Sequence, residues 1–469
     1  MAGMVVKNNM SAVNTLNVLN KNHSALQKSL EKVSSGMRIN SAGDDSSGYA
    51  ISERMRVQVR GLDQDNRNTQ NGNSMMKVAE GAIQQTVEII TTLKEKVLNA
   101  ANDTNTDSDR MQIQKELDQM VDQIDDNANV TYNGMYMIDG SHNRKVLTDP
   151  DTTYLTGGEG TTTHLTNRSF AETVTKTTPL VDLVDCTGRS LGIQDGDTVT
   201  VSWVKQGKTY SVAYKIDGDP ESANPTDLST LFTGGPTSPI VEEMPAGAAE
   251  QIRKDFVPSV RVSNEIGTDA SGNTVYTPDY KQAVTFRAAE RGVDGQISGL
   301  TIAITDKNGN FNKSANAILD NFEESIRAEN PSPDNAIVLQ TGTKANQAIK
   351  VGFSDMRSYA LGLKAKDGST LNVTTQKFAN AAINVLDYAL QKCLNQATTI
   401  GSVESRLDYT SANLVTASEN TQSSESTIRD ADMAAEMTAY TKNNVLLQAA
   451  QSMLAQANQN SSSVLSLLQ

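Results

Sequence analysis

Apolar residues recur at helical spacing close to the amino terminus. Between residues 13 and 33 they fall at steps of three and four, the stripe of a helix that packs against another helix. The stripe consists of Val13, Leu16, Leu19, Leu26, Leu30 and Val33, with His23 at the position between Leu19 and Leu26. Glycines and short polar residues at 34–36 and 43–48 favour turns and interrupt the pattern. Stripes of the same period predict further helices over 51–97 and 107–127.

Polar residues interrupt the stripe of the second predicted helix. Asn66, Thr69 and Asn73 occupy positions that apolar side chains fill elsewhere in the pattern. In paired helices such positions select one register among similar ones, at some cost in stability. We therefore expect this helix to pair with its partner in a fixed register.

The carboxyl-terminal end carries the same periodicity but lacks charge. Helical spacing recurs at 383–394 and again at Met437, Tyr440, Leu447, Leu454, Val464, Leu465, Leu467 and Leu468. From Asn443 to Gln469 no side chain is charged. A surface helix normally has a charged face, so we expect this helix to be covered on several sides, as it would be inside an assembly. An intramolecular helical bundle is the alternative interpretation.

The middle of the chain, 146–335, has a different pattern. It contains all 11 prolines, which long helices exclude. Alternating residues at 198–205 and 209–216, joined by a turn that contains glycine, predict a β-hairpin. Residues 285–287 and 300–305 predict weaker strands. The expected fold class is mainly α at the two ends, with a separate β-rich (α+β) middle region.

Residues 306–310 are similar to the opening of a calcium-binding loop. Such a loop needs a bidentate Glu at its twelfth position, and Ala317 stands there instead. We therefore interpret this segment as a hairpin turn.

Composition argues against several classes of function. The net charge of −14 disfavours nucleic-acid binding, which needs a concentrated basic face. The histidines are scattered, and neither Cys186 nor Cys393 has a Cys or His neighbour at metal-ligand spacing. We expect both cysteines to be unpaired, and we predict no catalytic residue, cofactor or metal. No apolar run reaches the roughly 18 residues of a membrane span, and no cleavable leader is expected.

The two ends, about half of the chain, resemble the ends of bacterial flagellins. Residues 34–51 match a flagellin phrase of the form SSGxRINxAxDDxxGxAI. Further landmarks lie at 78–82, 132–134, 426–437, 448–459 and 464–468. Residues 337–363 resemble the hairpin by which flagellins return from the outer domains to the core.

The resemblance implies a multi-domain, layered flagellin architecture. Residues 1–40 and 426–469 would form the inner core of the filament as coiled coils, and the apolar positions named above would be the polymerisation seam. Residues 41–145 and 336–425 would form a layer of helices and a β-hairpin. Residues 146–335 would be exposed on the outside as one or more variable domains.

The same resemblance implies a function and a set of partners. The chain would be a non-enzymatic structural subunit that polymerises into the filament used for swimming. Its first partner would be itself, with other flagellins, filament cap and hook-junction proteins and a flagellar export chaperone as further partners. It would reach the extracellular filament through the flagellar type III export pathway, without a cleavable signal peptide. A hook-junction protein, a secreted adhesin and an enzyme carried in the middle are the alternatives.

One stretch departs from the family. Flagellins recognised by the animal Toll-like receptor for flagellin usually carry Arg in a phrase like QRxREL, but residues 91–96 read TTLKEK. Thr92 replaces the key Arg and Lys96 replaces a Leu, whereas Glu116 keeps the family's acidic position. Loss of a guanidinium removes a typical interface anchor, so we predict weak receptor recognition. The alternative, that Lys94 compensates, stays open.

Overall fold

A computed structural model of the protein describes most of the chain. The described residues are 9–146, 160–171, 174, 178–216, 227–233, 241–256, 261–262, 265–268, 274–276 and 284–467. They divide into two compact units. The first comprises Met1–Gln70, Gln340–Ala348 and Asp408–Gln469, and the second comprises Asn71–Leu339 and Ile349–Leu407.

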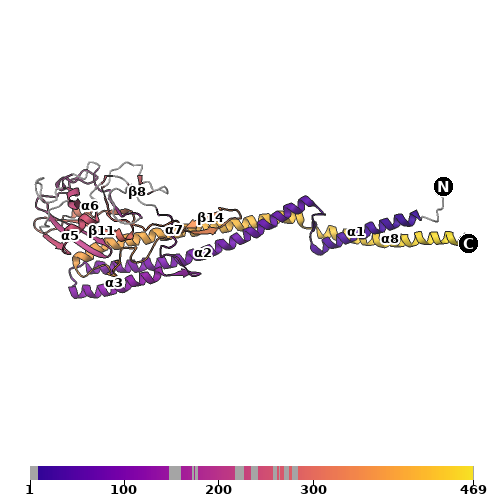
Figure 1. Cartoon of the computed structure of the whole chain (residues 1–469), viewed down its shortest axis with the longest axis horizontal. Coiled ribbons are helices and arrows are strands. Elements are labelled where there is room, and N and C mark those ends of the chain that lie inside the picture. The colour runs from indigo at the N-terminus through magenta and orange to yellow at the C-terminus, as the bar shows by residue number, and fades with distance from the viewer. Residues whose placement is uncertain are drawn as a thin grey trace. The chain divides into compact units, whose positions relative to one another are not determined.

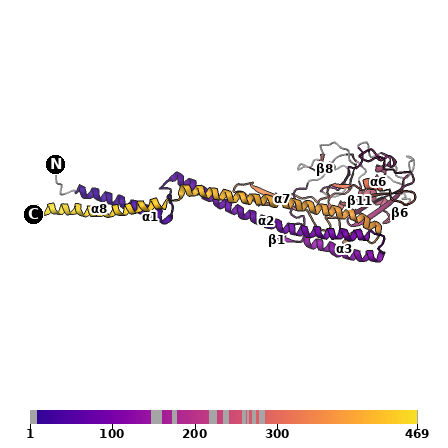
Figure 2. The ribbon, with the colours of Figure 1, turned by 180° about the vertical axis from the view of Figure 1, so that it is seen from behind.

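The first unit is made of helices from both ends of the chain. They are α1 (Met10–Ser35), α8 (Met433–Leu467), the beginning of α2 (Ser46–Ala100) and the end of α7 (Gln376–Arg429). Both views show α1 alongside α8 (Figure 1, Figure 2). The Asn9 side chain caps α1 by accepting a hydrogen bond from the amide of Ala12. The helix ends at Gly36, whose φ of 71° favours glycine. The first predicted helix and the turn after it are confirmed.

Polar side chains join α2 to α7 within the first unit. Asn66 Oδ1 accepts a hydrogen bond from Ser411 Oγ at 2.7 Å, and Asp63 Oδ1 accepts one from Ser418 Oγ at 2.9 Å. Thr69, in contrast, donates its hydroxyl to a carbonyl of its own helix. The prediction that polar residues of this stripe fix a register is therefore supported at Asn66.

The second unit contains a helical part built from α2, α3 (Asp107–Ala128) and α7. Thr106 and Asp109 form a capping box at the start of α3. A tight hairpin follows α3, formed by β1 (Thr131–Tyr132) and β2 (Met135–Tyr136). The helices share one apolar core, whose members include Ile83, Ile90, Leu93, Val97, Leu117, Val121, Ile124, Val385, Leu386 and Cys393. A second hairpin, β13 (Ile337–Gln340) with β14 (Ala348–Val351), precedes α7.

The β-rich part of the second unit contains two four-stranded sheets. One has the order β11-β4-β5-β6 and the other the order β12-β3-β10-β7, while β8 pairs with β9. The strands are β3 (His164–Asn167), β4 (Thr198–Lys205), β5 (Lys208–Lys215), β6 (Val241–Met244), β7 (Arg261–Val262), β8 (Glu265–Thr268), β9 (Thr274–Tyr276), β10 (Val284–Arg287), β11 (Ile297–Thr305) and β12 (Glu323–Ile326). The short helices are η1 (Leu180–Asp182), α4 (Leu228–Thr233), α5 (Ala248–Asp255), η2 (Val293–Gly295) and α6 (Lys313–Leu319).

The predicted β-hairpin is β4 and β5. Their register pairs Thr198 with Lys215 and Lys205 with Lys208. Gln206 and Gly207 form the turn with φ values of 51° and 70°, as the turn of a two-residue hairpin requires. Inward side chains of this hairpin, Trp203 among them, are fully buried in a second apolar core.

The turn predicted at 306–310 is also confirmed. The Asp306 carboxylate accepts hydrogen bonds from the amides of Asn308 at 2.7 Å and Asn310 at 3.0 Å. These backbone hydrogen bonds favour the ionised form and lower the pKa of Asp306.

Both cysteines are free, as predicted. Cys186 is exposed, whereas Cys393 lies inside the helical core, where burial raises the pKa of its thiol to about 12. Cys393 therefore behaves as a small apolar side chain.

A glycine allows the β-rich part to approach α7 closely. Gly299 of β11 has a φ of 71°, and a Cβ at this position would lie 2.8 Å from Val385 Cγ2 and 3.0 Å from the Val385 nitrogen. The backbone of α7 cannot easily move away, because Val385 belongs to the helical core.

We expect Gly299→Ala to destabilise the β-rich part by roughly 2–4 kcal/mol, from the left-handed conformation and the overlap together. Gly309→Ala is the control, because Gly309 has a similar φ of 80° but no atom within 4 Å of a Cβ there. It should cost only about 1–2 kcal/mol. Urea unfolding followed by the fluorescence of Trp203 measures both changes. Equal losses would show that the contact with α7 does not matter.

Candidate functional site

Helices α1 and α8 form an antiparallel pair within the first unit. Asn9 Nδ2 donates to the carbonyl of Ala457 at 3.3 Å, and Asn22 Nδ2 donates to the carbonyl of Leu446 at 3.3 Å. Closer to the other end of the pair, Asn443 Nδ2 donates to Ser29 Oγ at 3.1 Å. These bonds link positions about 415 to 450 residues apart in the chain and run in opposite directions along the two helices. Polar side chains therefore fix the register of the pair.

The pair buries only one side of each apolar stripe. Small residues of α8, Ala450 and Ala457, are buried, which allows close approach of the helices. Six of the fourteen predicted seam residues lie partly buried beside them: Leu19, Leu26, Val33, Tyr440, Leu447 and Leu454. This contact covers one face of α1 and one face of α8.

The rest of the apolar stripe is exposed. Among the described residues of the pair, large apolar side chains with more than two fifths of their surface exposed are Met10, Val13, Leu16, Val18, Leu30, Met433, Met437, Val445, Leu446 and Met453. Four of them, Val13, Leu16, Leu30 and Met437, belong to the predicted seam. Exposed apolar side chains along both helices mark an interaction surface. We call these ten residues the exposed apolar set.

The last four predicted seam positions lie outside the description. Leu468 is outside the described residues, and the structure describes no side chain for Val464, Leu465 or Leu467, although α8 extends to Leu467. Their place in the seam stays a prediction.

Arg429, the last residue of α7, holds together a junction within the first unit. Its Nη1 lies 2.5 Å from Glu53 Oε1 of α2, and its guanidinium stacks over the Tyr49 ring at 5.5 Å. The Nε atom donates to the sulfur of Met37 at 3.2 Å. The Arg429 side chain is 7% exposed, and its hydrogen bond lowers the pKa of Glu53. A single cation thus joins α2, α7 and the segment after α1.

Backbone hydrogen bonds complete this junction. The Arg38 amide donates to the carbonyl of Arg429 at 2.7 Å, and the Ala431 amide donates to the carbonyl of Gly36 at 2.9 Å. Met37 and Asp430 therefore form a short antiparallel bridge at the point where both chain segments leave their helices. The sequence analysis did not single out Arg429. Its partners are nearly 400 residues away in the chain, so no local pattern could indicate them.

The four residues of the predicted receptor-recognition region lie in the helical part of the second unit. Thr92 is half-buried and donates its hydroxyl to the carbonyl of Glu88 at 3.0 Å. Lys94 forms an ion pair with Asp387 of α7. Lys96 forms an ion pair with Glu116 at 2.9 Å. Both lysine charges are thus paired inside the chain.

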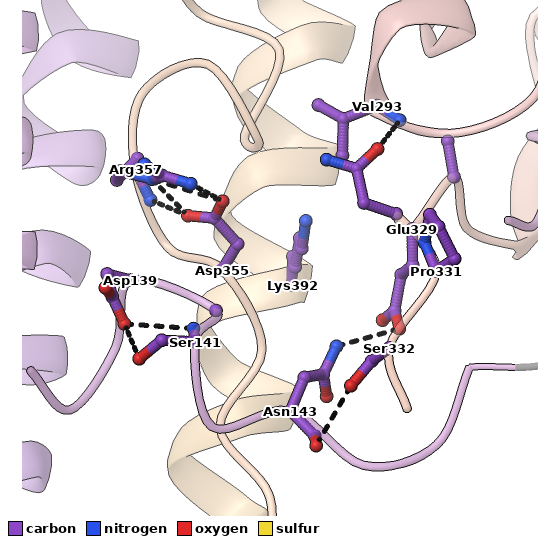
Figure 3. Close-up of a pocket in the computed structure, with 13 residues that line it drawn as sticks. Asp139, Ser141, Asn143, Val293, Glu329, Pro331, Ser332, Asp355, Arg357 and Lys392 are labelled. Carbon is purple, nitrogen blue, oxygen red and sulfur yellow. Dashed lines mark hydrogen bonds and ion pairs between the residues drawn. The ribbon is translucent and has the colours of Figure 1, made fainter. Parts of the chain in front are cut away.

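A polar cavity of about 290 Å³ lies in the second unit, between residues 139–143, 328–332 and 355–357 (Figure 3). Its charged groups bond to neighbours in the wall: Asp355 to Arg357 at 2.6 Å and Glu329 to Asn143 at 3.3 Å. Lys392 donates to the carbonyl of Ala360 at 2.9 Å. Each of these groups therefore has a bonding partner within the chain.

Among the described residues, no group of three or more His, Cys, Asp or Glu side chains is placed to hold a metal ion. None of the described helices combines the length and the apolar character needed to cross a membrane.

Comparison with family models matches both ends of the chain. The bacterial flagellin N-terminal helical region matches residues 6–143, and the bacterial flagellin C-terminal helical region matches residues 383–468. These two ranges contain α1, α2, α3, α8 and most of α7.

Curated relatives match over nearly their whole length. A flagellin of Clostridium tyrobutyricum is 30% identical over 458 residues, which cover 97% of this chain and 99% of the relative. A flagellin of Salmonella typhimurium is 28% identical over an alignment that covers 99% of each chain. Among solved structures, FliC from Burkholderia pseudomallei is similar at 16% identity with a TM-score of 0.24, covering 71% of this chain and 99% of that one.

We expect Arg429→Ala to open the junction, because Glu53 and Tyr49 lose the cation between them. Hydrogen exchange of the amides at 36–39 and 429–432 should accelerate by about five- to thirtyfold. Arg56→Ala is the matched control, because Arg56 also pairs with Glu53, at 3.2 Å, but its side chain is 38% exposed. It should change exchange little. Unchanged protection in Arg429→Ala would show that the backbone bridge alone holds the junction.

Proposed function

This chain belongs to the bacterial flagellin family, and we propose that copies of it join to one another through the exposed apolar set of α1 and α8. As a flagellin it is a structural subunit that polymerises through its terminal helical regions into the flagellar filament, outside the cell, and serves swimming motility. The proposal concerns which side chains make the joint.

One observation carries the proposal: α1 and α8 pair with each other and still leave ten large apolar side chains exposed along both helices. A monomer that remained alone in water would gain nothing from such a surface. From Asn443 onward α8 also has no charged side chain, so neighbours can cover it without burying an unpaired charge. A second copy of the same helix pair offers complementary apolar surface of the same kind.

We further propose the layered arrangement that the family resemblance implies. Residues 1–40 and 426–469 would form the inner core, 41–145 and 336–425 the layer around it, and 146–335 the outer surface. The junction at Arg429 supports the first boundary, because α1 ends and α8 begins there. The change from helices to sheets within the second unit supports the other boundary.

The remaining partners and the export route are proposals from family membership. They are other flagellins, the filament cap, hook-junction proteins, an export chaperone and the flagellar type III pathway. We also propose that the chain has no catalytic role. The partners of Asp355, Glu329 and Lys392 around the cavity support this, since each of these charged groups is already engaged within the chain.

We propose weak recognition by the Toll-like receptor for flagellin. Thr92 offers a hydroxyl where a guanidinium would anchor the interface, and that hydroxyl bonds to its own helix. Lys94 could compensate only by giving up Asp387, and Lys96 only by giving up Glu116. Breaking these ion pairs would offset part of the free energy that the lysines could gain by binding the receptor.

Replacing Leu16 and Leu30 together by Gln should raise the critical concentration for filament assembly by at least about tenfold. A leucine that becomes fully buried contributes about 1.5–3 kcal/mol, and each of these two has about half of its surface left to bury, so the pair contributes about 1.5–3 kcal/mol. Sulfate promotes assembly by strengthening apolar burial, and sedimentation of the polymer measures the concentration left in solution. The control exchanges two exposed polar residues of α1, Asn17→Gln with Gln27→Asn, and should assemble like the parent. An unchanged critical concentration for the leucine variant would refute the proposed joint.

Receptor recognition is tested with cells that report receptor activation. The unaltered protein should signal at least about tenfold more weakly than a standard flagellin. Thr92→Arg should recover part of the signal by restoring the guanidinium, whereas Thr91→Arg, one position around the helix, should not. Full activity of the unaltered protein would contradict the proposal.

A further inference from the structure

One face of α7 holds the β-rich part of the second unit. Asn384, Tyr388 and Lys392 are spaced four residues apart, so they lie in a row along the helix. Asn384 hydrogen-bonds the Asp320 carboxylate, and the Tyr388 hydroxyl donates to the carbonyl of Phe322. Asn384 and Tyr388 therefore attach α7 to the segment that leads from α6 into β12.

A carboxyl group is buried in the same contact. The side chain of Glu324, in β12, is 4% exposed. Its ion partner is Arg327, whose Nε lies 3.3 Å from Glu324 Oε2. From α7, Tyr388 and the buried Lys392 lie near enough to interact electrostatically with Glu324. Lys392, however, donates its hydrogen bond to the carbonyl of Ala360. Glu324 thus lacks a direct ion pair with α7.

Other charged groups around this contact do not offset the cost of burying the ionised Glu324 carboxylate. Glu329 repels a negative charge on Glu324. Asp387 of α7 already pairs with Lys94. The neighbouring strand β3 contributes His164, whose ring lies 3.0 Å from the Thr162 hydroxyl. A negative charge on Glu324 is therefore costly in this position.

The ionisation equilibria reflect this cost. Burial raises the pKa of Glu324 to about 7, against the opposing pull of Arg327 and Lys392. Asp320 as a whole is exposed, but the protein packed around its carboxylate raises its pKa to about 6, against the hydrogen bonds from Asn384 and the Ile302 backbone. Both groups change charge between mildly acidic and neutral solution.

We propose that Asp320, Glu324, Tyr388 and Lys392 form a proton-sensitive latch that holds the β-rich part of the second unit against α7 more tightly in acidic than in alkaline solution. The docked state keeps a proton on Glu324, and the undocked state releases it to water. The proposed assembly through α1 and α8 does not depend on this response to pH.

The direction follows from linkage. Once undocked, Glu324 has the ordinary glutamate pKa of 4.5, whereas docked it has the raised value. Between these values the docked state binds one more proton, so rising pH favours undocking. Docking is tightest below the ordinary pKa, weakens as pH rises, and changes little more above the raised pKa. Asp320 acts in the same direction.

Hydrogen exchange of the full-length protein at pH 5.5 to 8.5, corrected for the intrinsic rate, tests the latch. Amides of β12 and of residues 384–392 should lose protection by about tenfold or more across this range. Glu324→Gln, which cannot ionise, should keep most of its protection at pH 8.5. Glu323→Gln is the matched control, because Glu323 is the exposed neighbour in β12, and it should behave like the parent.

Tyr388→Phe separates the latch from ordinary packing. It removes the hydrogen bond to Phe322 and should lower protection equally at every pH, leaving the pH step in place. Equal protection of the parent protein at both ends of the range would overturn the proposal. So would a pH step that persists undiminished in Glu324→Gln.

Discussion

Helices from opposite ends of the chain pair antiparallel, α1 with α8 and α2 with α7, and the other described elements lie between α2 and α7 in the sequence. The pairing is selective because polar bonds such as Asn22 to Leu446 and Asn66 to Ser411 allow one register. Apolar burial supplies the stability, and the polar contacts decide which positions meet. The Arg429 junction extends this control to the segments where α1 and α7 end.

The two pairs differ in how completely they bury their apolar stripes. In the second unit α2 and α7 share a core with α3, so residues such as Ile90 and Leu386 are fully covered. In the first unit α1 packs against α8, and Val13 and Leu16 keep nearly half of their surface exposed. Flagellins polymerise through their terminal helical regions, and the incompletely buried pair, α1 with α8, lies in these regions. Assembly can thus bury the apolar side chains of α1 and α8 that remain exposed in the single chain.

Local patterns predicted the elements well, because helix ends and hairpins are determined by neighbouring residues. Gly36 ends α1, and Gln206 with Gly207 turns β4 into β5. The same patterns could not say which side of the α1 stripe faces α8, because both sides are apolar. Nor could they place β3 between β12 and β10, since those partners are more than 100 residues away along the chain. Arg429 escaped notice for the same reason.

Entry to and exit from the β-rich part lie next to each other. The Val146 amide donates to the carbonyl of Ser332 at 3.2 Å, so 185 intervening residues begin and end at one narrow neck. The entropic cost of closing a loop rises only slowly with its length, so the two ends of this region can stay together when its length changes. The region beyond the neck can therefore gain or lose residues while residues 146 and 332 remain in contact. Chains of different length can in this way carry the same terminal helices.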